Sequence, residues 1–505
     1  MQGKKKYQEK LFLNFQLSSA VPEDNFYRRL NQLIDFTFLY KATAQYYGSE
    51  GQRSIDPVVF MKLMLVGYLE NCNSDRRIIS ISKMRLDILY FIGYDIDEEL
   101  PWHSTLSRTR QLYGEEVFMK LFKNVLKQCV DKGMVSGKRQ AIDGVYVKAN
   151  ASFDSMVSRE IMNDAEVFGK ELAENEQDES ASIVKLAPPK SSKQKQNPAN
   201  ETHYNRNDPE AKISVKPGKA VALNYLGQVS VDTSSHTITH IQAFPADLRD
   251  SDCLPEVVKQ LKDNLQGLGM TLEEIVADTG YSSGKALQSL EENNIEGYIP
   301  NRAQFIYERT DFPYNKVGDY YQCKNNKRLT YRGTYLAGKY YNKEYRLDRP
   351  ECKNCSFQVG CTAYGKHKTR IRETIDRPYY ERMHLRMQSF KAKIAMKQRQ
   401  STVEPVIGTL VNFLGMKRVN TIGRIQANKC LTMAAIAYNL KKLLKHSTER
   451  PKKTMEQAVQ NRKRVNDSLK LIENALVVLI IVFTERMIQL LVKVTMKQKW
   501  NACSG

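Results

Sequence analysis

The sequence predicts an α/β protein in which an all-α region comes first and a cysteine-containing insertion interrupts the α/β core. Three observations support this prediction. Apolar residues recur at helical spacing through roughly the first 130 residues. From about residue 138, β-branched and aromatic residues predominate, and between residues 219 and 300 short apolar strands alternate with helices. At 505 residues, the chain is long enough to form several domains.

The N-terminal region, residues 1–132, is predicted to consist of short helices. Pro57 opens an apolar helix over residues 57–69, because proline suits a first helical turn. Further helices are expected over residues 76–92 and 106–129, the latter capped by Ser104 or Thr105. Their basic faces fit a helix-turn-helix-like DNA-binding domain, and an ordinary helical bundle fits them equally well.

The first part of the α/β core spans residues 133–300. Its first strand, residues 139–148, contains the Asp143-Gly144 pair, and two later strands are expected to pair antiparallel. The other expected segments are strands at 219–231, 237–244, 274–278 and 297–300, helices at 150–185, 254–268 and 285–292, and a mobile loop at 186–210 that is rich in Pro, Lys and Asn.

Three further segments complete the chain. Residues 301–375 form a basic insertion that carries clustered cysteines. The core resumes over residues 376–445, where helical spacing predicts helices at 401–414 and 424–444. A basic helical tail, residues 446–505, follows.

The composition indicates the class of partner. With 41% hydrophobic and 26% charged residues, the chain is not largely disordered. It has 77 Lys and Arg against 56 Asp and Glu, a net charge of +21, which favours nucleic acid over a membrane surface; the alternative is a basic protein without such a partner. No apolar run approaches the roughly 18–20 residues that span a bilayer, and no signal peptide is recognisable, so we expect a cytoplasmic protein without membrane contact.

Two strand-associated carboxylates are candidates for a metal site. Asp143 and Asp278 stand in or at the end of apolar strands, where an unpaired charge is costly. With Glu404 on a downstream helix they would offer the oxygen ligands that suit Mg²⁺ or Mn²⁺, and two such ions about 4 Å apart can drive phosphodiester displacement. The alternative is that each aspartate closes a turn, since spacing alone does not assemble the three acids.

Several sequence blocks resemble bacterial insertion-sequence DDE transposases. The blocks are residues 141–152 around Asp143, 276–281 around Asp278, 398–408 around Glu404, the following helix at 435–442, and N-terminal segments at 57–77 and 103–108. The resemblance covers about residues 15–445. It implies an RNase H-like fold, with Asp143, Asp278 and Glu404 as the catalytic residues and the ligands of two Mg²⁺ or Mn²⁺ ions.

The chain departs from the family pattern near its glutamate. Val411 stands where the family has a lysine, and Lys417 and Arg418 are the candidates to replace its DNA contact. Trp102 stands where many relatives have an aspartate. Pro405 disfavours α geometry in the residue before it, so Glu404 is expected at a helix start or a kink.

Other basic residues are candidates for DNA contacts. Arg399 could pair with a phosphate or with Glu404, or could be a solvated charge on a helix. In the N-terminal blocks, Arg76, Arg77 and Arg108 are candidates for the same role. Between residues 361 and 400, eleven Lys and Arg stand against three acids and are interleaved with aromatic residues, a pattern typical of nucleic-acid binding.

The clustered cysteines have two interpretations. Cys323 is followed by the run Cys352, Cys355 and Cys361, and four thiols of this kind could hold a structural Zn²⁺. Equally, they could be free cysteines in a small core.

Taken with the resemblance, these features lead to a functional expectation. The protein is expected to bind the terminal inverted repeats of its element, to cleave their 3′ ends with two metal ions, and to transfer them to target DNA as a homodimer. Two alternatives remain: an inactive DNA-binding protein derived from a transposase, and a metal-dependent nuclease that does not join DNA.

Overall fold

A computed structural model describes residues 5, 15–48, 50, 54–159, 198–215, 221–337, 340–347, 352, 355–364, 369–449 and 486. The chain divides into two compact units, Met1–Lys442 and Leu443–Gly505. Most of the helix expected over residues 150–185, the loop before residue 198, and nearly all of the tail after residue 449 lie outside the described residues. The described part of the segment 186–210 contains a short helix and a strand, α10 (Pro198–Thr202) and β3 (His203–Asn205); β3 pairs with β2 (Met156–Ser158), which follows the 3-10 turn η2 (Phe153–Ser155).

The N-terminal region is helical, as predicted. Both of the longer predicted helices are interrupted, because Arg85 and Tyr113 adopt extended backbone. Extension at Tyr113 places its ring in the core, 5.3 Å from the ring of Phe60. The elements are α1 (Leu17–Ala20), α2 (Phe26–Leu33), α3 (Phe38–Thr43), η1 (Ala44–Tyr46), α4 (Pro57–Leu69), α5 (Asp75–Met84), α6 (Leu86–Ile92), α7 (His103–Leu112) and α8 (Glu115–Asp131).

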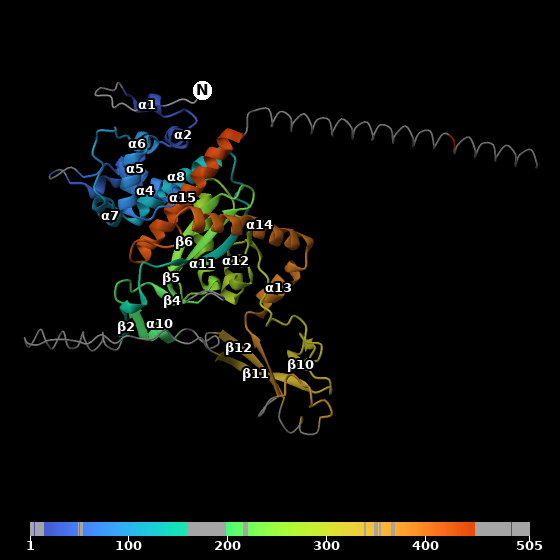
Figure 1. Cartoon of the computed structure of the whole chain (residues 1–505). Helices are drawn as coiled ribbons and strands as arrows, with labels where there is room; N and C mark the ends of the chain where they lie inside the picture. Colours follow the sequence, from blue (N-terminus) through green and yellow to red (C-terminus); the bar gives the residue numbers. More distant parts are fainter. Residues whose placement is uncertain are drawn as a thin grey trace, which may run out of the picture. The chain divides into compact units, whose positions relative to one another are not determined.

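A mixed sheet forms the centre of the first unit (Figure 1). Its strand order is β6-β5-β1-β7-β8. The strands β1, β5 and β6 are antiparallel, whereas β7 and β8 run parallel to β1. This order and these directions confirm the RNase H-like fold. The strands are β1 (Arg139–Lys148), β5 (Ala222–Asp232), β6 (Ile238–Pro245), β7 (Glu274–Val276) and β8 (Glu296–Tyr298), and β4 (Lys212–Ser214) extends the edge beside β5.

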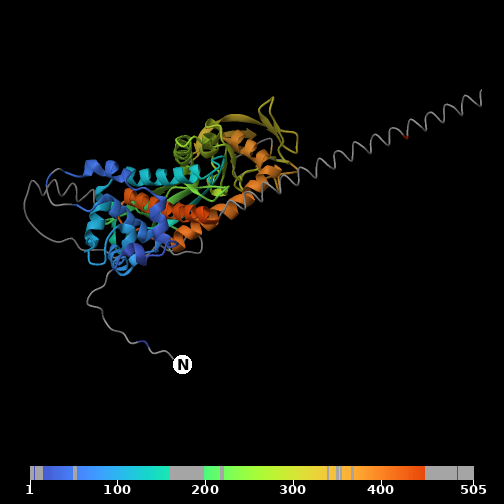
Figure 2. The same ribbon diagram turned by 90° about the horizontal axis from the view of Figure 1, so that it is seen from above.

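Helices cover both faces of this sheet. The helices α11 (Asp250–Gln266) and α12 (Gly284–Glu292) pack on the face that contains Ile142. Side chains alternate along a strand, so Asp143 points to the opposite face, where α14 packs on β1 and β5. On that side α15 (Arg424–Glu449) lies between the sheet and the N-terminal helices (Figures 1 and 2).

The helix that carries Glu404 is longer than predicted. The helix α14 runs without interruption over Phe390–Phe413, so the expectation that Glu404 begins a helix is wrong. Ser389 caps the helix by accepting a hydrogen bond from the Ala392 amide at 3.1 Å. Pro405 lies inside it and withholds one backbone donor from the carbonyl four residues earlier. It is preceded by α13 (Arg377–Met387).

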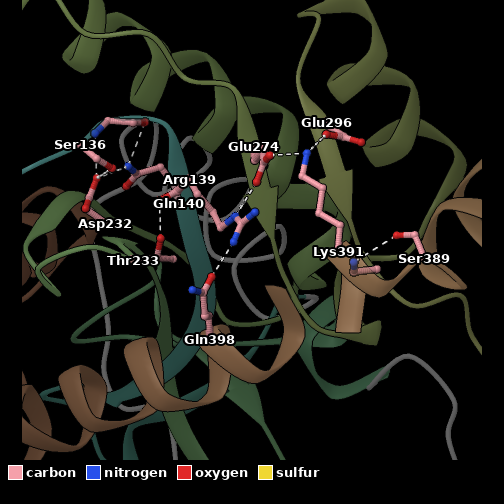
Figure 3. A network of polar contacts seen from close by, with 12 residues as sticks. Ser136, Arg139, Gln140, Asp232, Thr233, Glu274, Glu296, Ser389, Lys391 and Gln398 are labelled. Carbon is pink, nitrogen blue, oxygen red and sulfur yellow. Dashed lines mark hydrogen bonds and ion pairs between the residues drawn. The ribbon is translucent and has the colours of Figure 1, made fainter. Parts of the chain in front are cut away.

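A polar network ties the first half of α14 to the sheet (Figure 3). Arg139 on β1 pairs with Glu274 on β7 and donates to Gln398 on α14 at 2.5 Å. Lys391 on α14 bridges Glu274 at 2.6 Å and Glu296 on β8 at 2.7 Å. These contacts set the position of the helix against three neighbouring strands.

The insertion contains an antiparallel sheet that the sequence analysis did not predict. Its strands are β9 (Tyr314–Asn315), β10 (Tyr320–Gln322), β11 (Arg328–Ala337), β12 (Tyr340–Leu347) and β13 (Thr369–Thr374). In the described part of the insertion, eight buried residues form its core, including Tyr321, Leu329, Tyr345 and Cys352. In β13, buried Ile371 is flanked by exposed Arg370 and Arg372, so the apolar pattern is too short to be recognised.

The N-terminal helices are joined to the segment that follows α14. Asn71 accepts a hydrogen bond from the Gly415 amide at 2.9 Å and donates to the Asn412 carbonyl at 3.0 Å. Asn73 donates to the Gly415 carbonyl at 2.8 Å, and its own carbonyl accepts from Asn420 at 2.6 Å. The loop between α4 and α5 therefore fixes the end of the glutamate helix. Among the described residues, no helix is both long and apolar enough to cross a membrane.

Candidate active site

The three predicted carboxylates come from three elements that meet at one end of the mixed sheet. Asp143 lies on β1, Asp278 follows β7, and Glu404 lies on α14. Their side chains are 21%, 46% and 59% exposed, respectively. The site therefore opens from a largely buried aspartate towards a solvent-accessible glutamate.

Arg399 lies between these carboxylates. Its Nη2 is 3.0 Å from Asp143 Oδ2 and 3.9 Å from Asp278 Oδ2, and its Nη1 is 3.8 Å from Glu404 Oε1. The residue is only 6% exposed, and its Nε is buried without a hydrogen-bond partner. Arg399 thus lies within ion-pair distance of Glu404, one of the partners considered from the sequence, and also of the two aspartates, which were not considered.

The electrostatics of the site favour a further cation. Burial raises the pKa of Asp143 to about 6; Arg399 opposes this shift, while the charges of Asp278 and Asp250 add to it. Carboxylates that repel one another in a partly desolvated site gain most from a bound cation, and divalent cations with oxygen ligands suit them.

The donor set fits a divalent metal, but the acids do not form a closed coordination shell. Within the described ranges, no three His, Cys, Asp or Glu side chains are grouped closely enough to hold an ion. The guanidinium of Arg399 occupies the space towards which the three acids converge. An ion at this place would therefore require Arg399 to shift.

Lys417 and Arg418 lie beside the end of β1. The Lys148 amide donates to the Lys417 carbonyl at 3.3 Å, and Arg418 donates from Nη2 to Asn150 Oδ1 at 2.9 Å. Both basic side chains are exposed, whereas Val411 is half-buried on α14. The structure thus places the two residues near the strand that carries the buried aspartate.

The three N-terminal arginines are placed apart from the acids. Arg76 and Arg77 lie on α5 and Arg108 on α7, and all three side chains are exposed. The helices α5 and α7 pack against each other, so the three arginines belong to one small helical group. None of them takes part in the ion pairs that the described residues form with Asp143, Asp278 and Glu404.

Two sequence families match the chain. Residues 15–112 match a family described as a transposase domain (DUF772), and residues 322–444 match a family described as a transposase DDE domain. The chain therefore carries transposase domains, the second of them of the DDE type. The second match contains Arg399 and Glu404, whereas Asp143 and Asp278 lie before it.

Solved transposase structures resemble this transposase at low identity. A piggyBac transposase synaptic complex with hairpin DNA is 10% identical over 86% of this chain and 82% of that one, with a TM-score of 0.23. A Mos1 transposase paired-end complex with the left transposon end is 11% identical over 54% and 67%, with a TM-score of 0.16. A Mos1 mariner paired-end complex with Mn is 9% identical over 52% and 64%, also with a TM-score of 0.16. No protein with a curated description matches the sequence.

The four cysteines of the insertion line one cavity of about 110 Å³ in the transposase. Cys352 is buried, and its sulfur accepts a hydrogen bond from the Thr369 hydroxyl at 3.2 Å. Cys323, Cys355 and Cys361 are half-buried. The four thiols face a common space, but no three of these described side chains are close enough to hold an ion as they are placed.

Sequence analysis missed one carboxylate of this transposase site. Asp250 is the first residue of α11, and its charge contributes to the raised pKa of Asp143. The sequence signal for Asp250 was its position at the start of the helix that follows β6. In the sheet, β6 is separated from β1, the strand of Asp143, by β5 alone. That position becomes informative only when the strand order is known.

Proposed function

We propose that this transposase cleaves and joins DNA with two divalent metal ions held by Asp143, Asp278 and Glu404. The observation that carries the proposal is the convergence of these three carboxylates on Arg399. When bound, Mg²⁺ or Mn²⁺ ions would activate the attacking oxygen and stabilise the leaving oxygen of a phosphodiester. The Mn of the Mos1 complex supports this class of ion.

The chain's own residues have distinct parts in this proposal. Asp143, the most buried acid, anchors the ions to the central strand. Glu404, the most exposed, faces the DNA side. Arg399 balances the acids when the ions are absent, and Lys417 and Arg418 contact DNA phosphates beside the end of β1.

The helical region is proposed to bind the terminal inverted repeats as part of a homodimer on DNA. Arg76, Arg77 and Arg108 offer exposed guanidinium groups on neighbouring helices, which suit phosphate contacts or guanine edges. The net charge of +21 supports a DNA partner of this kind.

We also propose a structural Zn²⁺ held by the cysteine-lined cavity, with Cys323, Cys352, Cys355 and Cys361 as its ligands. The core formed by the described residues of the insertion is small, with eight buried residues, and small cores often need a metal to hold them together. Binding would draw the four thiols closer than they stand now. Zinc content of the purified chain, with Cys352→Ser as the comparison, tests the proposal; no zinc in the unaltered chain would refute it.

Cleavage of a DNA fragment that carries the element's own ends tests the main proposal. Asp143→Asn, Asp278→Asn and Glu404→Gln should each bind the fragment and fail to cut it in Mg²⁺, while Asp252→Asn, an exposed acid, should cut normally. Binding without cleavage by the unaltered protein would favour an inactive derivative. Cleavage without joined products would favour a nuclease.

A further inference from the structure

The sheet of the insertion has one face that is turned away from the insertion's core. Side chains alternate along β12 and β13, so Tyr345, Leu347 and Ile371 point into the core and their neighbours point away from it. In β13 the outward side chains, Arg370 and Arg372, are exposed. Because paired residues on neighbouring strands share a face, the strand register defines this outer face. It carries Tyr320, Arg328, Tyr335, Arg346, Arg370 and Arg372.

Arginines predominate on the outer face. Arg346 on β12 stands directly opposite Arg370 on β13, and like charges in this position repel each other. Glu344 is the one acid that the described strands contribute to the face, and its Oε2 lies 3.7 Å from Arg370 Nη1 and 3.4 Å from Arg372 Nε. The two arginine side chains nevertheless remain 44% and 45% exposed. Such a group of arginines suits a ligand with regularly spaced anionic groups, as in a phosphodiester chain.

Two of these arginines are stacked on tyrosine rings of the same face. Arg372 Cζ lies 4.9 Å from the centre of the Tyr335 ring, and Arg328 Cζ lies 4.8 Å from the centre of the Tyr320 ring. Tyr340, opposite Ala337 at the end of the hairpin, adds a ring that is 42% exposed. Guanidinium planes and tyrosine rings are the groups on which unpaired nucleobases stack. The bases of a duplex stack on one another, so this combination favours a single strand.

We infer that the outer face binds unpaired DNA, with its arginines on the phosphates and its tyrosines against the bases. The inference rests on the proposed function for the source of this ligand, because strands cut at an element end can fray and expose unpaired bases. A second copy of the chain suits the face less well, because arginines would meet arginines across a twofold axis.

Binding of a fluorescent oligothymidine of about 20 nucleotides to the full chain, followed by anisotropy without Mg²⁺, tests the inference, since this length exceeds a typical binding site. Arg372→Gln should weaken binding roughly fivefold and lower the slope of log Kd against log salt by about 0.7, because one phosphate contact is lost. Tyr335→Leu should weaken binding about tenfold and leave the slope unchanged, because stacking releases no counterions.

Arg382→Gln on α13 is the matched control and should bind oligothymidine as the unaltered protein does. Arg382 is likewise stacked on a tyrosine, 5.0 Å from the centre of the Tyr379 ring, and paired with a glutamate, and its side chain is 48% exposed. It lies outside the sheet of the insertion, so it reports what the loss of any such arginine does.

Exposed Arg370 provides a further variant if Tyr335→Leu does not fold, and Arg370→Gln should also lower the salt slope. Equal effects of Arg372→Gln and Arg382→Gln, or normal binding by all of the outer-face variants, would overturn the inference. Equal weakening of binding to a duplex element end would overturn it too, because the face would then be a general contact for the DNA backbone. If the unaltered protein binds oligothymidine through this face but does not cut element ends, the inference stands and the proposed function fails.

Discussion

The guanidinium of Arg399 donates a hydrogen bond to Asp143 Oδ2 at 3.0 Å, across 256 residues of sequence. This contact joins the glutamate helix to the central strand at the site itself. It also gives the partly buried Asp143 a cationic partner when no metal is bound. Arg399 therefore has two roles. It helps to hold α14 in position, and it balances part of the negative charge of the site.

Removing this cation should destabilise the metal-free protein. Arg399→Gln should lower the free energy of unfolding by up to about 3 kcal/mol, because Asp143, whose side chain is 21% exposed, loses its counter-charge. Added Mg²⁺ should restore part of the loss. Urea unfolding with and without Mg²⁺ measures both effects. Arg382→Gln, which breaks an exposed pair with Glu291 at 2.7 Å, should cost less than about 1 kcal/mol; an equal cost for the two variants would contradict the assignment.

A buried histidine should make the fold sensitive to acid. His240 on β6 is fully buried, and burial lowers its pKa to about 4. The unfolded chain takes up this proton near pH 6.5, whereas the folded chain resists it, so stability should fall as pH drops from about 6.5 to about 4, by up to about 3 kcal/mol. His240→Gln should show a shallower loss in urea unfolding across this range. An unchanged slope would place the acid sensitivity in other groups.

The joint between the helical region and α14 should be sensitive to one methyl group. Gly415 has φ of +69°, and a Cβ atom there would lie 2.5 Å from Asn73 Oδ1. Gly93 has φ of +83° with nothing within 4 Å, so Gly93→Ala isolates the conformational cost of about 1 kcal/mol. Gly415→Ala should lower the free energy of unfolding, measured with urea, by clearly more than Gly93→Ala does. It should also slow DNA cleavage. Equal costs would mean that Asn73 moves aside freely.

A buried lysine links α15 to the end of α7. Lys429 is 2% exposed and donates from Nζ to the carbonyls of Arg110 at 3.0 Å and Tyr113 at 2.7 Å. Lys429→Met should lower stability by about 2–3 kcal/mol, because two buried carbonyls lose their donor. Thermal unfolding measures this loss. As the comparison, Lys441 is exposed and its Nζ lies 3.4 Å from the Leu69 carbonyl, so Lys441→Met should lower stability little in the same measurement.

Local patterns predicted the elements of the core well. The apolar strands β1, β5, β6, β7 and β8 and the helices α11, α12 and α15 lie close to their predicted ranges, because each has a continuous apolar stripe. The predicted start of the Glu404 helix, residue 401, is wrong: α14 begins at Phe390, directly after Ser389, whose hydroxyl caps it. The sheet of the insertion was not predicted, because charged residues flank its few buried apolar residues.

The composition of the acid site could be predicted only in part. Asp143, Asp278 and Glu404 were named from their blocks, but spacing along the chain says nothing of the arginine that joins them. Asp250 can be placed near the site only from the strand order. It accepts a hydrogen bond from Gln228 on β5, which lies directly opposite Gly144 on the neighbouring strand β1. Contacts of this kind depend on tertiary packing, which periodicity does not encode.

The hydrogen bonds of Asn71 and Asn73 also bear on how such enzymes can be recombined. Both asparagines lie in the segment that matches one transposase family, and their partners Gly415 and Asn420 lie in the segment that matches the other. Because these hydrogen bonds join the two segments, a change in one segment must remain compatible with the other. A chimera that takes its first 112 residues from a relative should work only if residues 412–420 come from the same parent, so new end specificities are best sought by exchanging both pieces together.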